Sequence, residues 1–587
     1  MSPRLFLIIL LLAHTVAHAG LQFGKPQWGF DGAISKNTFN LLSLEVSNSS
    51  ASAFDGEITL DDSGSFSSPY KVHVFLAPGS ARWVQFFPYI GGHIPDWRLI
   101  WDEEKRPASA TLNPGGEQPR EGPPAVVILA SADDPTLRST RMPVFDEALF
   151  PPTVAATDAL HAVILDHQPK LDPARREAFL DWLRRGGTVH LLPGSDGAFP
   201  QFTGDFAPLN ITADNARVGA GMVAKHATAR SEITPQTLAG AGHPLPTLRT
   251  GDSNSWNRED SSFFATLAGL TRPNIAWPLI YLLTIIYVAL IGPAFYFLRK
   301  RDYRLILTGF ILTVAGFAWI FTVVGRRGYG EKQIYHSVGI ARSLGGGRYD
   351  IEHWVHAFAT SGDSYRLAHP GGGQLYTVLS NNSETIRASV LHGKDAAVLA
   401  DIPLFSSRPF IHRGAMTGPD PGLAIEKIER PPQASGNSSS VLTRLVLRVG
   451  PAFPPNVMNS AVEFRGSYYP LRREGDLLVA ATSSATNLHA ALGVGTGEEE
   501  GHHYYGRTST PAEALAQLRG MAGILASRVS PLGTNVERRK SARPPSSDSI
   551  RVFIYAEAPA AFRMQSDQFQ AGTEYLLYVH DIPLPNS

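Results

Sequence analysis

Two long apolar stretches near the middle of the chain dominate its hydropathy pattern. Residues 275–298 and 305–325 contain no charged side chain, and only the basic segment 299–304 separates them. A helix needs about 20 residues to cross the ~30 Å hydrocarbon core of a bilayer. The alternative is a buried hairpin in a soluble core, where charge-free runs of this length are rare. The pattern therefore predicts two transmembrane helices joined by a short loop.

The N-terminus predicts the orientation of this hairpin. Arg4 precedes the apolar run Leu5 to Leu12, and the small residues of Ala17-His18-Ala19 follow. This is the pattern of a secretory signal peptide, expected over residues 1–19. Export of the chain would leave the basic loop in the cytoplasm, as the excess of Lys and Arg in cytoplasmic loops favours. We expect a multi-pass protein of the bacterial inner membrane with large periplasmic domains.

Between the signal peptide and about residue 106, short alternating runs predict β-strands. They cover residues 40–48, 55–60, 71–76 and 81–87, with turn residues between them. Leu42, Leu44 and Val46 would share one face of a pleated strand. The expected product over residues 20–106 is an Ig-like β-sandwich.

The pattern changes after a linker rich in proline and glycine at 107–124. Residues 125–130 and 161–166 are continuous apolar runs of the kind found in parallel strands buried on both faces. Asp172 and Pro173 are typical of a helix start, and Gly186-Gly187 of its end, before a third apolar run at 188–192. This strand–helix–strand order predicts a flavodoxin-like α/β domain over residues 122–265.

Beyond the hairpin, residues 331–587 are expected to form an exported β-rich domain. Predicted strands cover 375–379, 385–391, 441–449, 461–464, 477–480, 551–556 and 574–579. A helical and polar insertion is expected at about 490–549, with a helix over 511–527. The last two strands would return to the sheet formed before the insertion. The predicted fold class is thus multidomain: β-sandwich, α/β domain, transmembrane hairpin and β-rich domain.

Composition narrows the possible chemistry. The chain has 52 basic and 52 acidic residues and no net charge, so no global electrostatic attraction to nucleic acid is expected. It has no cysteine, which excludes disulfides, thiolate metal sites and a cysteine nucleophile. We expect no cofactor. The expected partners are the lipid bilayer and other envelope membrane proteins.

Two segments resemble known proteins. Residues 161–194, HAVILDHQPKLDPARREAFLDWLRRGGTVHLLPG, resemble class I glutamine amidotransferase-like domains, and 286–307 resemble the hairpin of uncharacterised bacterial envelope proteins. In those proteins a signal peptide, an Ig-like domain and an amidotransferase-like domain precede two spanning helices. True amidotransferases need a cysteine, so the resemblance implies a non-catalytic domain here.

Two constellations carry candidate chemistry. Asp166 and His167 follow a predicted parallel strand, and Ser195 follows the next one, so together they are candidate catalytic residues of a hydrolase-like site. A run of glutamates ending at Glu500, which includes Glu499, lies next to His502 and His503 and offers candidate metal ligands. The alternative readings are polar turns and solvated loops.

These observations lead to one preferred function and two alternatives. The preferred hypothesis is a membrane-anchored envelope protein whose exported domains act as a non-catalytic protein-interaction scaffold or adaptor. The first alternative is a hydrolase-like enzyme that uses the α/β domain. The second is an envelope glycan-binding protein, for which Tyr468-Tyr469 and Tyr504-Tyr505 are the aromatic candidates.

Overall fold

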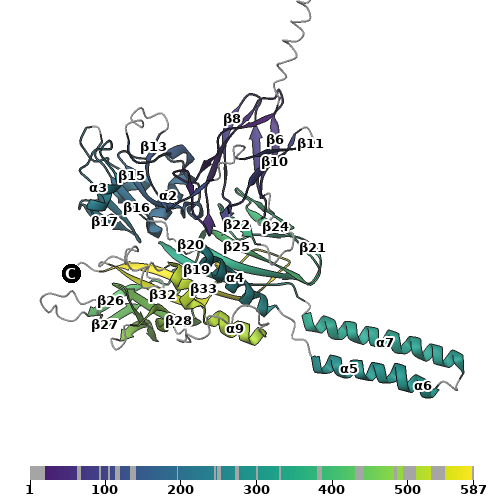
Figure 1. Ribbon diagram of the computed structural model, residues 1–587. Coiled ribbons are helices and arrows are strands. Elements are labelled where there is room, and N and C mark those ends of the chain that lie inside the picture. The colour runs from purple at the N-terminus through teal and green to yellow at the C-terminus, as the bar shows by residue number, and fades with distance from the viewer. Residues whose placement is uncertain are drawn as a thin grey trace, which may run out of the picture.

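The protein is predominantly β-structure, arranged in several sheets from which a helical hairpin projects (Figure 1). The computed structural model describes residues 20–584, with breaks at 63–67, 92–93, 104–105, 113–118, 132–139, 195, 244–245, 247–252, 272–276, 299–301, 330–331, 380–386, 430–441, 482–485, 493–509 and 530–548. The predicted signal peptide at 1–19 lies outside the described residues. Below, the N-terminal half means residues 20–271 and the C-terminal half means residues 332–584.

The alternating runs of the N-terminal half form strands, as predicted. Leu42, Leu44 and Val46 of β5 are all buried on one face. Two sheets enclose an apolar cluster that includes these side chains. The strands are β1 (Leu21–Phe23), β2 (Gln27–Trp28), β5 (Leu42–Asn48) and β8 (Ala81–Phe86) on one side, and β6 (Phe54–Asp62), β7 (Tyr70–Leu76), β10 (Trp97–Glu103) and β11 (Arg106–Thr111) on the other.

One sheet joins the two halves of the chain. Its strand order is β11-β10-β6-β7-β23-β24-β21, and its last three strands are β23 (Ala388–Leu391), β24 (Ala397–Ile402) and β21 (Asp363–Leu367). In this bridging sheet β23 runs parallel to β7, with Val390 opposite Tyr70. The strand predicted at 385–391 therefore exists but pairs across the halves, which the sequence pattern did not indicate. The apolar cluster beneath it also contains residues of both halves.

The segment after the linker forms a mostly parallel sheet. Its order is β14-β13-β15-β16-β18-β17, and β17 alone among these strands is antiparallel to its neighbour. The bounds are β13 (Ala125–Ala130), β14 (Val144–Asp146), β15 (Leu160–Leu165), β16 (Thr188–Leu191), β17 (Asn215–Val218) and β18 (Gly221–Lys225). The three apolar runs of the sequence are the central strands β13, β15 and β16, as predicted. We call this the parallel sheet.

Helix α2 (Pro173–Arg185) connects β15 to β16 and has the predicted ends. The Asp172 carboxylate accepts a hydrogen bond from the backbone N–H of Arg175 at 2.9 Å, which caps the first turn. Gly187 follows the helix because a Cβ there would come within 2.5 Å of the Trp182 ring. The Trp182 indole in turn donates to the carbonyl of Leu160 at 3.0 Å. These contacts lock the helix against the parallel sheet.

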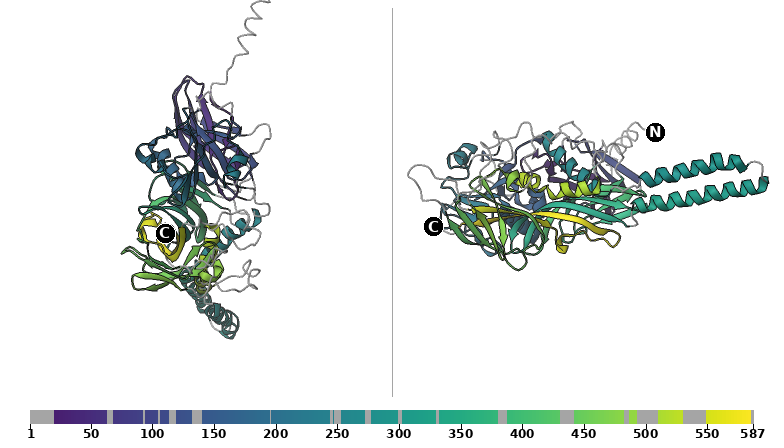
Figure 2. Two further views of the ribbon diagram at one scale, coloured as in Figure 1. Left: turned by 90° about the vertical axis from the view of Figure 1, so that its left-hand side faces the viewer. Right: turned by 90° about the horizontal axis from the view of Figure 1, so that it is seen from below.

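Two helices among the described residues are long and apolar enough to cross a membrane. They cover Trp277–Phe297 and Tyr303–Val324, with a mean hydropathy of 2.1 each, and no side chain in these windows is buried. The first contains α5 (Trp277–Ala289), a π-helical turn (Leu290–Ala294) and α6 (Phe295–Leu298), and the second is α7 (Tyr303–Tyr329). The π-turn coincides with Pro293, which cannot donate a helical hydrogen bond. Both helices project from the same end of the body (Figures 1 and 2).

The C-terminal half is built on a long sheet of order β22-β25-β20-β19-β33-β32-β28-β29. The bounds are β19 (Ile334–Gly345), β20 (Arg348–Ala359), β22 (Leu375–Val378), β25 (Ser406–Thr417), β28 (Val457–Phe464), β29 (Ser467–Pro470), β32 (Ser549–Glu557) and β33 (Gln570–Pro583). The strands predicted at 551–556 and 574–579 do return beside the strand predicted at 461–464. The strands predicted at 441–449 and 477–480 instead join a smaller sheet made of β26 (Ala424–Glu429), β27 (Arg444–Arg448), β31 (Leu477–Ala481) and β30 (Arg472–Glu474).

Helices from both halves cover one face of the long sheet. Helix α4 (Ser253–Leu270) precedes the hairpin, yet it contacts β19, β20 and α9 (Pro511–Arg519) of the C-terminal half. The helix predicted over 511–527 is divided at Gly520 into α9 and α10 (Ala522–Val529). The end of the predicted α/β segment therefore packs on the other half of the chain.

A buried network of ion pairs connects the N-terminal half to the C-terminal half, at the place where the parallel sheet meets the long sheet. Arg413 lies 2.9 Å from the carboxylates of both Asp158 and Asp350, and Arg185 lies 2.6 Å from Asp158. Burial alone would raise the pKa of Asp350, but the guanidinium groups of Arg413 and Arg185 hold it below its ordinary value. Partners thus come from sequence positions more than 250 residues apart, as the separation of Asp158 from Arg413 shows.

The same network continues around α4. Asp260 accepts hydrogen bonds from Trp354 at 2.8 Å, Tyr89 at 2.9 Å and Arg528 at 2.7 Å. The Arg528 guanidinium also stacks on the Trp354 ring, 4.6 Å from its centroid. Because a buried carboxylate needs such partners, Asp260 fixes α4 against strands and helices of both halves.

Candidate functional site

The carboxyl ends of the parallel strands bring polar side chains to one edge of the parallel sheet. Asp166 and His167 follow β15, His226 follows β18, and Glu147 begins the short helix η2 (Glu147–Leu149) after β14. Open α/β sheets bind ligands at this edge. Figure 1 shows these strands side by side at the upper left of the body.

His167 is held between two carboxylates at this edge. Its Nδ1 lies 2.9 Å from Oδ1 of Asp166, and its Nε2 lies 3.3 Å from Oε2 of Glu147. The hydrogen bonds that the ring donates to the carboxylates of Asp166 and Glu147 raise the pKa of His167 to about 9. The imidazole is therefore protonated at neutral pH and is unsuited to act as a general base.

The two carboxylates are stabilised as anions by further donors. Burial alone would raise the pKa of Glu147, but hydrogen bonds from His167 and from the Lys170 backbone N–H, at 3.1 Å, lower it. Asp166 likewise has a lowered pKa, since His167 and the Arg230 guanidinium, 3.3 Å away, outweigh the effect of burial. The group is a paired cluster of two anions and two cations rather than an acid/base couple poised near neutrality.

The structure brings together two of the three predicted catalytic residues. Asp166 and His167 are in contact, whereas Ser195 lies outside the described residues. On either side of this position, the Gly194 N–H donates to the Ala198 carbonyl at 2.8 Å. Glu147 and Arg230 complete the cluster and were missed in the sequence, where nothing in their spacing links them to Asp166.

A second group at the parallel sheet consists of three histidines. His190 lies on β16, His226 follows β18, and His243 follows α3 (Pro235–Gly240). Nδ1 of His190 lies 2.9 Å from Nε2 of His226, and ligand atoms of all three residues lie within 4.8 Å of one another. Burial lowers the pKa of His226, which favours the neutral ring that metals bind. Residue spacing does not connect these three histidines, although His190 is a polar residue within a fully buried strand.

A further buried triad lies on the long sheet. His353 of β20 faces His412 of β25, with their Nδ1 atoms 3.4 Å apart, and His369 stacks on His412 with ring centroids 3.8 Å apart. Nε2 of His412 donates to the Gln374 side-chain oxygen at 2.7 Å. Burial lowers the pKa of His353 to about 3, so this ring is neutral throughout the physiological range. The residues Glu499, His502 and His503, predicted as metal ligands, lie outside the described residues.

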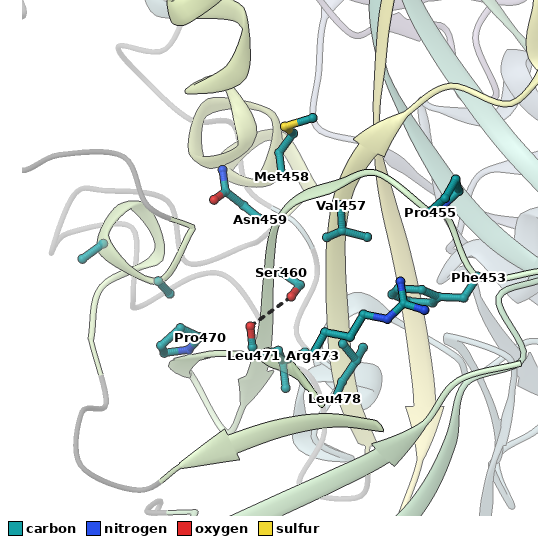
Figure 3. Close-up of a pocket in the computed structure, with 12 residues that line it drawn as sticks. Phe453, Pro455, Val457, Met458, Asn459, Ser460, Pro470, Leu471, Arg473 and Leu478 are labelled. Atoms are coloured by element: carbon teal, nitrogen blue, oxygen red, sulfur yellow. Dashed lines mark hydrogen bonds between the residues drawn. The ribbon is translucent and has the colours of Figure 1, made fainter. Parts of the chain in front are cut away.

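An open cavity of about 400 Å³ lies between the smaller sheet and the end of the long sheet (Figure 3). Met458, Leu471 and Leu478 contribute apolar surface, and Arg473 stacks over the Phe453 ring at 5.1 Å. None of its described lining residues is acidic or a histidine. The described lining therefore provides apolar surface and the Arg473 cation, but no acid or base for hydrolysis.

Comparison with known proteins identifies no family. No protein-family model and no curated protein matches this chain. Among solved structures, the Fcho1 Mu homology domain of Danio rerio with bound Eps15 peptide aligns over 42% of this chain and 94% of its own, at 9% identity and a TM-score of 0.17. A β-glucuronidase from glycoside hydrolase family 2 aligns over 98% of this chain and 62% of its own, at 8% identity and a TM-score of 0.12. Likenesses this weak carry no argument about fold or function.

Proposed function

We propose that this chain is a bacterial inner-membrane protein whose periplasmic body serves as a non-catalytic scaffold for other envelope proteins. In this proposal α5 to α7 form the membrane anchor. The N-terminal and C-terminal halves then form a single rigid platform above the lipid surface.

The observation that carries the proposal is the bridging sheet. Strand β7 precedes the hairpin and β23 follows it, yet the two are hydrogen-bonded neighbours. Because a sheet cannot continue across a bilayer with its edges unpaired, both halves must lie on the same side of the membrane. The hairpin must then enter and leave on that side, which agrees with two crossings and a short loop on the other side.

One feature supports the orientation, and a second supports the closeness of the body to the lipid surface. The loop between the helices carries Arg299, Lys300, Arg301 and Arg304, the excess of positive charge that favours the cytoplasm. At the opposite end of the helices, β19 begins at Ile334, directly after α7, and the β24–β25 turn lies at that same end of the long sheet. Leu404 in this turn is 61% exposed and Phe405 is 38% exposed, which suits contact with the lipid interface.

The chemistry of the candidate site favours a scaffold over the two alternatives. A hydrolase would need His167 neutral, whereas two carboxylates keep it protonated. A glycan platform would need exposed aromatic rings, whereas the Tyr468 and Tyr469 side chains are buried. The second pair of aromatic candidates, Tyr504-Tyr505, lies outside the described residues.

Cysteine labelling tests the anchoring, because the chain has no native cysteine. Asp302→Cys lies in the loop of the hairpin, and Lys427→Cys lies on β26 with a 57% exposed side chain. In cells with a permeabilised outer membrane, an impermeant maleimide should label position 427 only, and position 302 should react after the inner membrane is opened. Labelling of position 302 before opening would contradict the proposed orientation.

Extraction of the intact protein from native membranes into lipid discs tests the scaffold function. We expect other envelope membrane proteins to be extracted together with this chain, in a constant ratio to it. The His167→Gln variant should give the same ratio as the native chain. The extracted protein should hydrolyse neither glutamine nor simple esters above background. Recovery of the 63.6 kDa chain alone, or turnover that Ser195→Ala abolishes, would contradict the proposal.

A further inference from the structure

The triad of His190, His226 and His243 has a ring arrangement suited to a single metal ion. Their ring planes meet at 59°, 70° and 76°, and their centroids are 4.9 to 5.5 Å apart. A ring nitrogen binds a metal through a lone pair in the plane of the ring. Three rings at steep mutual angles can therefore aim their nitrogens at one common point.

The distances fit a small tetrahedral ion. Two nitrogens that bind one Zn²⁺ at 2.0–2.1 Å are separated by about 3.3–3.4 Å. His190 Nδ1 and His226 Nε2 are 2.9 Å apart, so an ion in place of this hydrogen bond requires a separation of only about 0.4 Å more. The ligand atom of His243 lies within 4.8 Å of those of His190 and His226.

The backbone holds each ligand in place. The His226 N–H donates to the Leu191 carbonyl at 2.9 Å, and the His243 N–H donates to the Leu238 carbonyl at 2.9 Å. Gly242 has a φ of +82°, a conformation that turns the chain after α3 and that glycine adopts without strain. Ile233 and Leu238 are fully buried in the neighbouring apolar cluster. The ligands thus come from a strand and two anchored turns.

The second histidine triad lacks this geometry. His369 and His412 are stacked at an interplanar angle of 6° with centroids 3.8 Å apart. An ion midway between parallel rings would lie well outside both ring planes, where neither lone pair points. His353, His369 and His412 therefore serve as a buried packing group in the long sheet, and they provide a natural comparison.

We propose that His190, His226 and His243 bind one divalent transition-metal ion, with Zn²⁺ as the representative. Imidazole ligands suit Zn²⁺, Cu²⁺, Ni²⁺ and Co²⁺, whereas Ca²⁺ and Mg²⁺ require oxygen ligands. Three protein ligands leave a fourth tetrahedral position for water or for a partner's side chain. The site is independent of the proposed scaffold function, because neither the bridging sheet nor the anchor takes part in it.

Metal titration of the full-length protein in detergent, after chelator treatment, tests the site. By calorimetry we expect one Zn²⁺ per chain, and with Co²⁺ the visible absorption bands of a tetrahedral ion with nitrogen ligands. His226→Asn or His243→Asn should lower the affinity more than ~100-fold, since loss of a direct ligand exceeds the effect of an outer-shell change. Zn²⁺ should raise the unfolding temperature of the native chain and of neither variant.

Variants of other histidines show whether this triad binds the ion. His73→Asn changes an exposed histidine, and His369→Asn changes the stacked triad, so both should retain binding. Absence of binding by the native chain would overturn the proposal, as would binding that survives in the His226→Asn/His243→Asn double variant. Loss of the ion in His369→Asn, or in a variant of His502 and His503, would assign it elsewhere and also overturn the proposal. Even if a variant fails to fold, a native chain that binds no Zn²⁺ or gives no tetrahedral Co²⁺ bands overturns the proposal.

Discussion

The charged cluster at the edge of the parallel sheet and the network between the two halves use the same residue types under different conditions. His167 at the edge is 33% exposed, and all members of its cluster fall between residues 147 and 230. Asp350 and Arg413 in the network are 0% and 4% exposed, and their partners extend from residue 158 to residue 413. The network thus joins the two halves through buried charges, whereas the edge cluster joins residues of one half and includes a partly exposed ring.

The helical hairpin lies between two chain segments that pack against each other. The network, the bridging sheet and the shared apolar clusters all join chain segments on either side of the hairpin. The two halves of such a body have little freedom to separate. Disruption of the network should therefore affect the whole fold, whereas disruption of the edge should affect local behaviour.

The largest effect is expected from Arg413→Met. The change leaves the buried carboxylate of Asp350 and the partly buried carboxylate of Asp158 without a principal cation, at a cost of about 3–5 kcal/mol in the free energy of unfolding. Denaturant unfolding of the detergent-solubilised protein measures it. Arg448→Met, which breaks an exposed pair with Glu426, is the matched control and should cost at most about 1 kcal/mol. Equal losses in the two variants would contradict the role of the network in joining the two halves.

A double-mutant cycle on Asp260 and Arg528 should reveal the next largest effect. Asp260→Asn and Arg528→Met each remove a charge from a buried pair 2.7 Å apart. We expect a coupling energy of about 1.5–3 kcal/mol, because the second change relieves the charge left unpaired by the first. Strictly additive losses in the unfolding free energy would show that the pair does not join α4 to α10.

A pH effect of about 1 kcal/mol is expected at the edge. The pKa of His167 is about 9 in the folded protein and 6.5 in the unfolded chain, where the ring has no partners. The contribution of the ring to stability is therefore complete below pH 6.5 and is lost between pH 6.5 and 9. The value is reduced for the solvent exposure of the ring. His167→Gln should flatten the stability profile in this window. An unchanged slope in the variant would contradict the ion-pair assignment.

The smallest effect on stability is expected at the β24–β25 turn. Leu404→Cys changes an exposed side chain, so the unfolding free energy should stay within about 0.5 kcal/mol of the native value. A spin label at this position in lipid discs should collide with dissolved oxygen more than with a water-soluble nickel chelate. The same label at Lys427→Cys should show the reverse, and equal behaviour at both sites would place the turn away from lipid.

Local elements could be predicted because their causes are local. The alternation of Leu42, Leu44 and Val46 specifies a half-buried strand, and Asp172, Pro173 and Gly186 specify the ends of α2. Half of the edge cluster was predictable for the same reason, since Asp166 and His167 directly follow an apolar strand. Glu147 and Arg230 reach them only through the strand order of the parallel sheet, which residue spacing does not encode.

The sequence by itself determined which segments are strands, helices and apolar hairpin, because propensity, capping and hydrophobic periodicity act over a few residues. Only the tertiary structure decided that β23 pairs with β7, that Arg413 lies beside Asp158, and that His190, His226 and His243 converge. These contacts join positions far apart in the chain, and each depends on the packing of whole sheets. Their register and proximity follow from the complete core rather than from any local pattern.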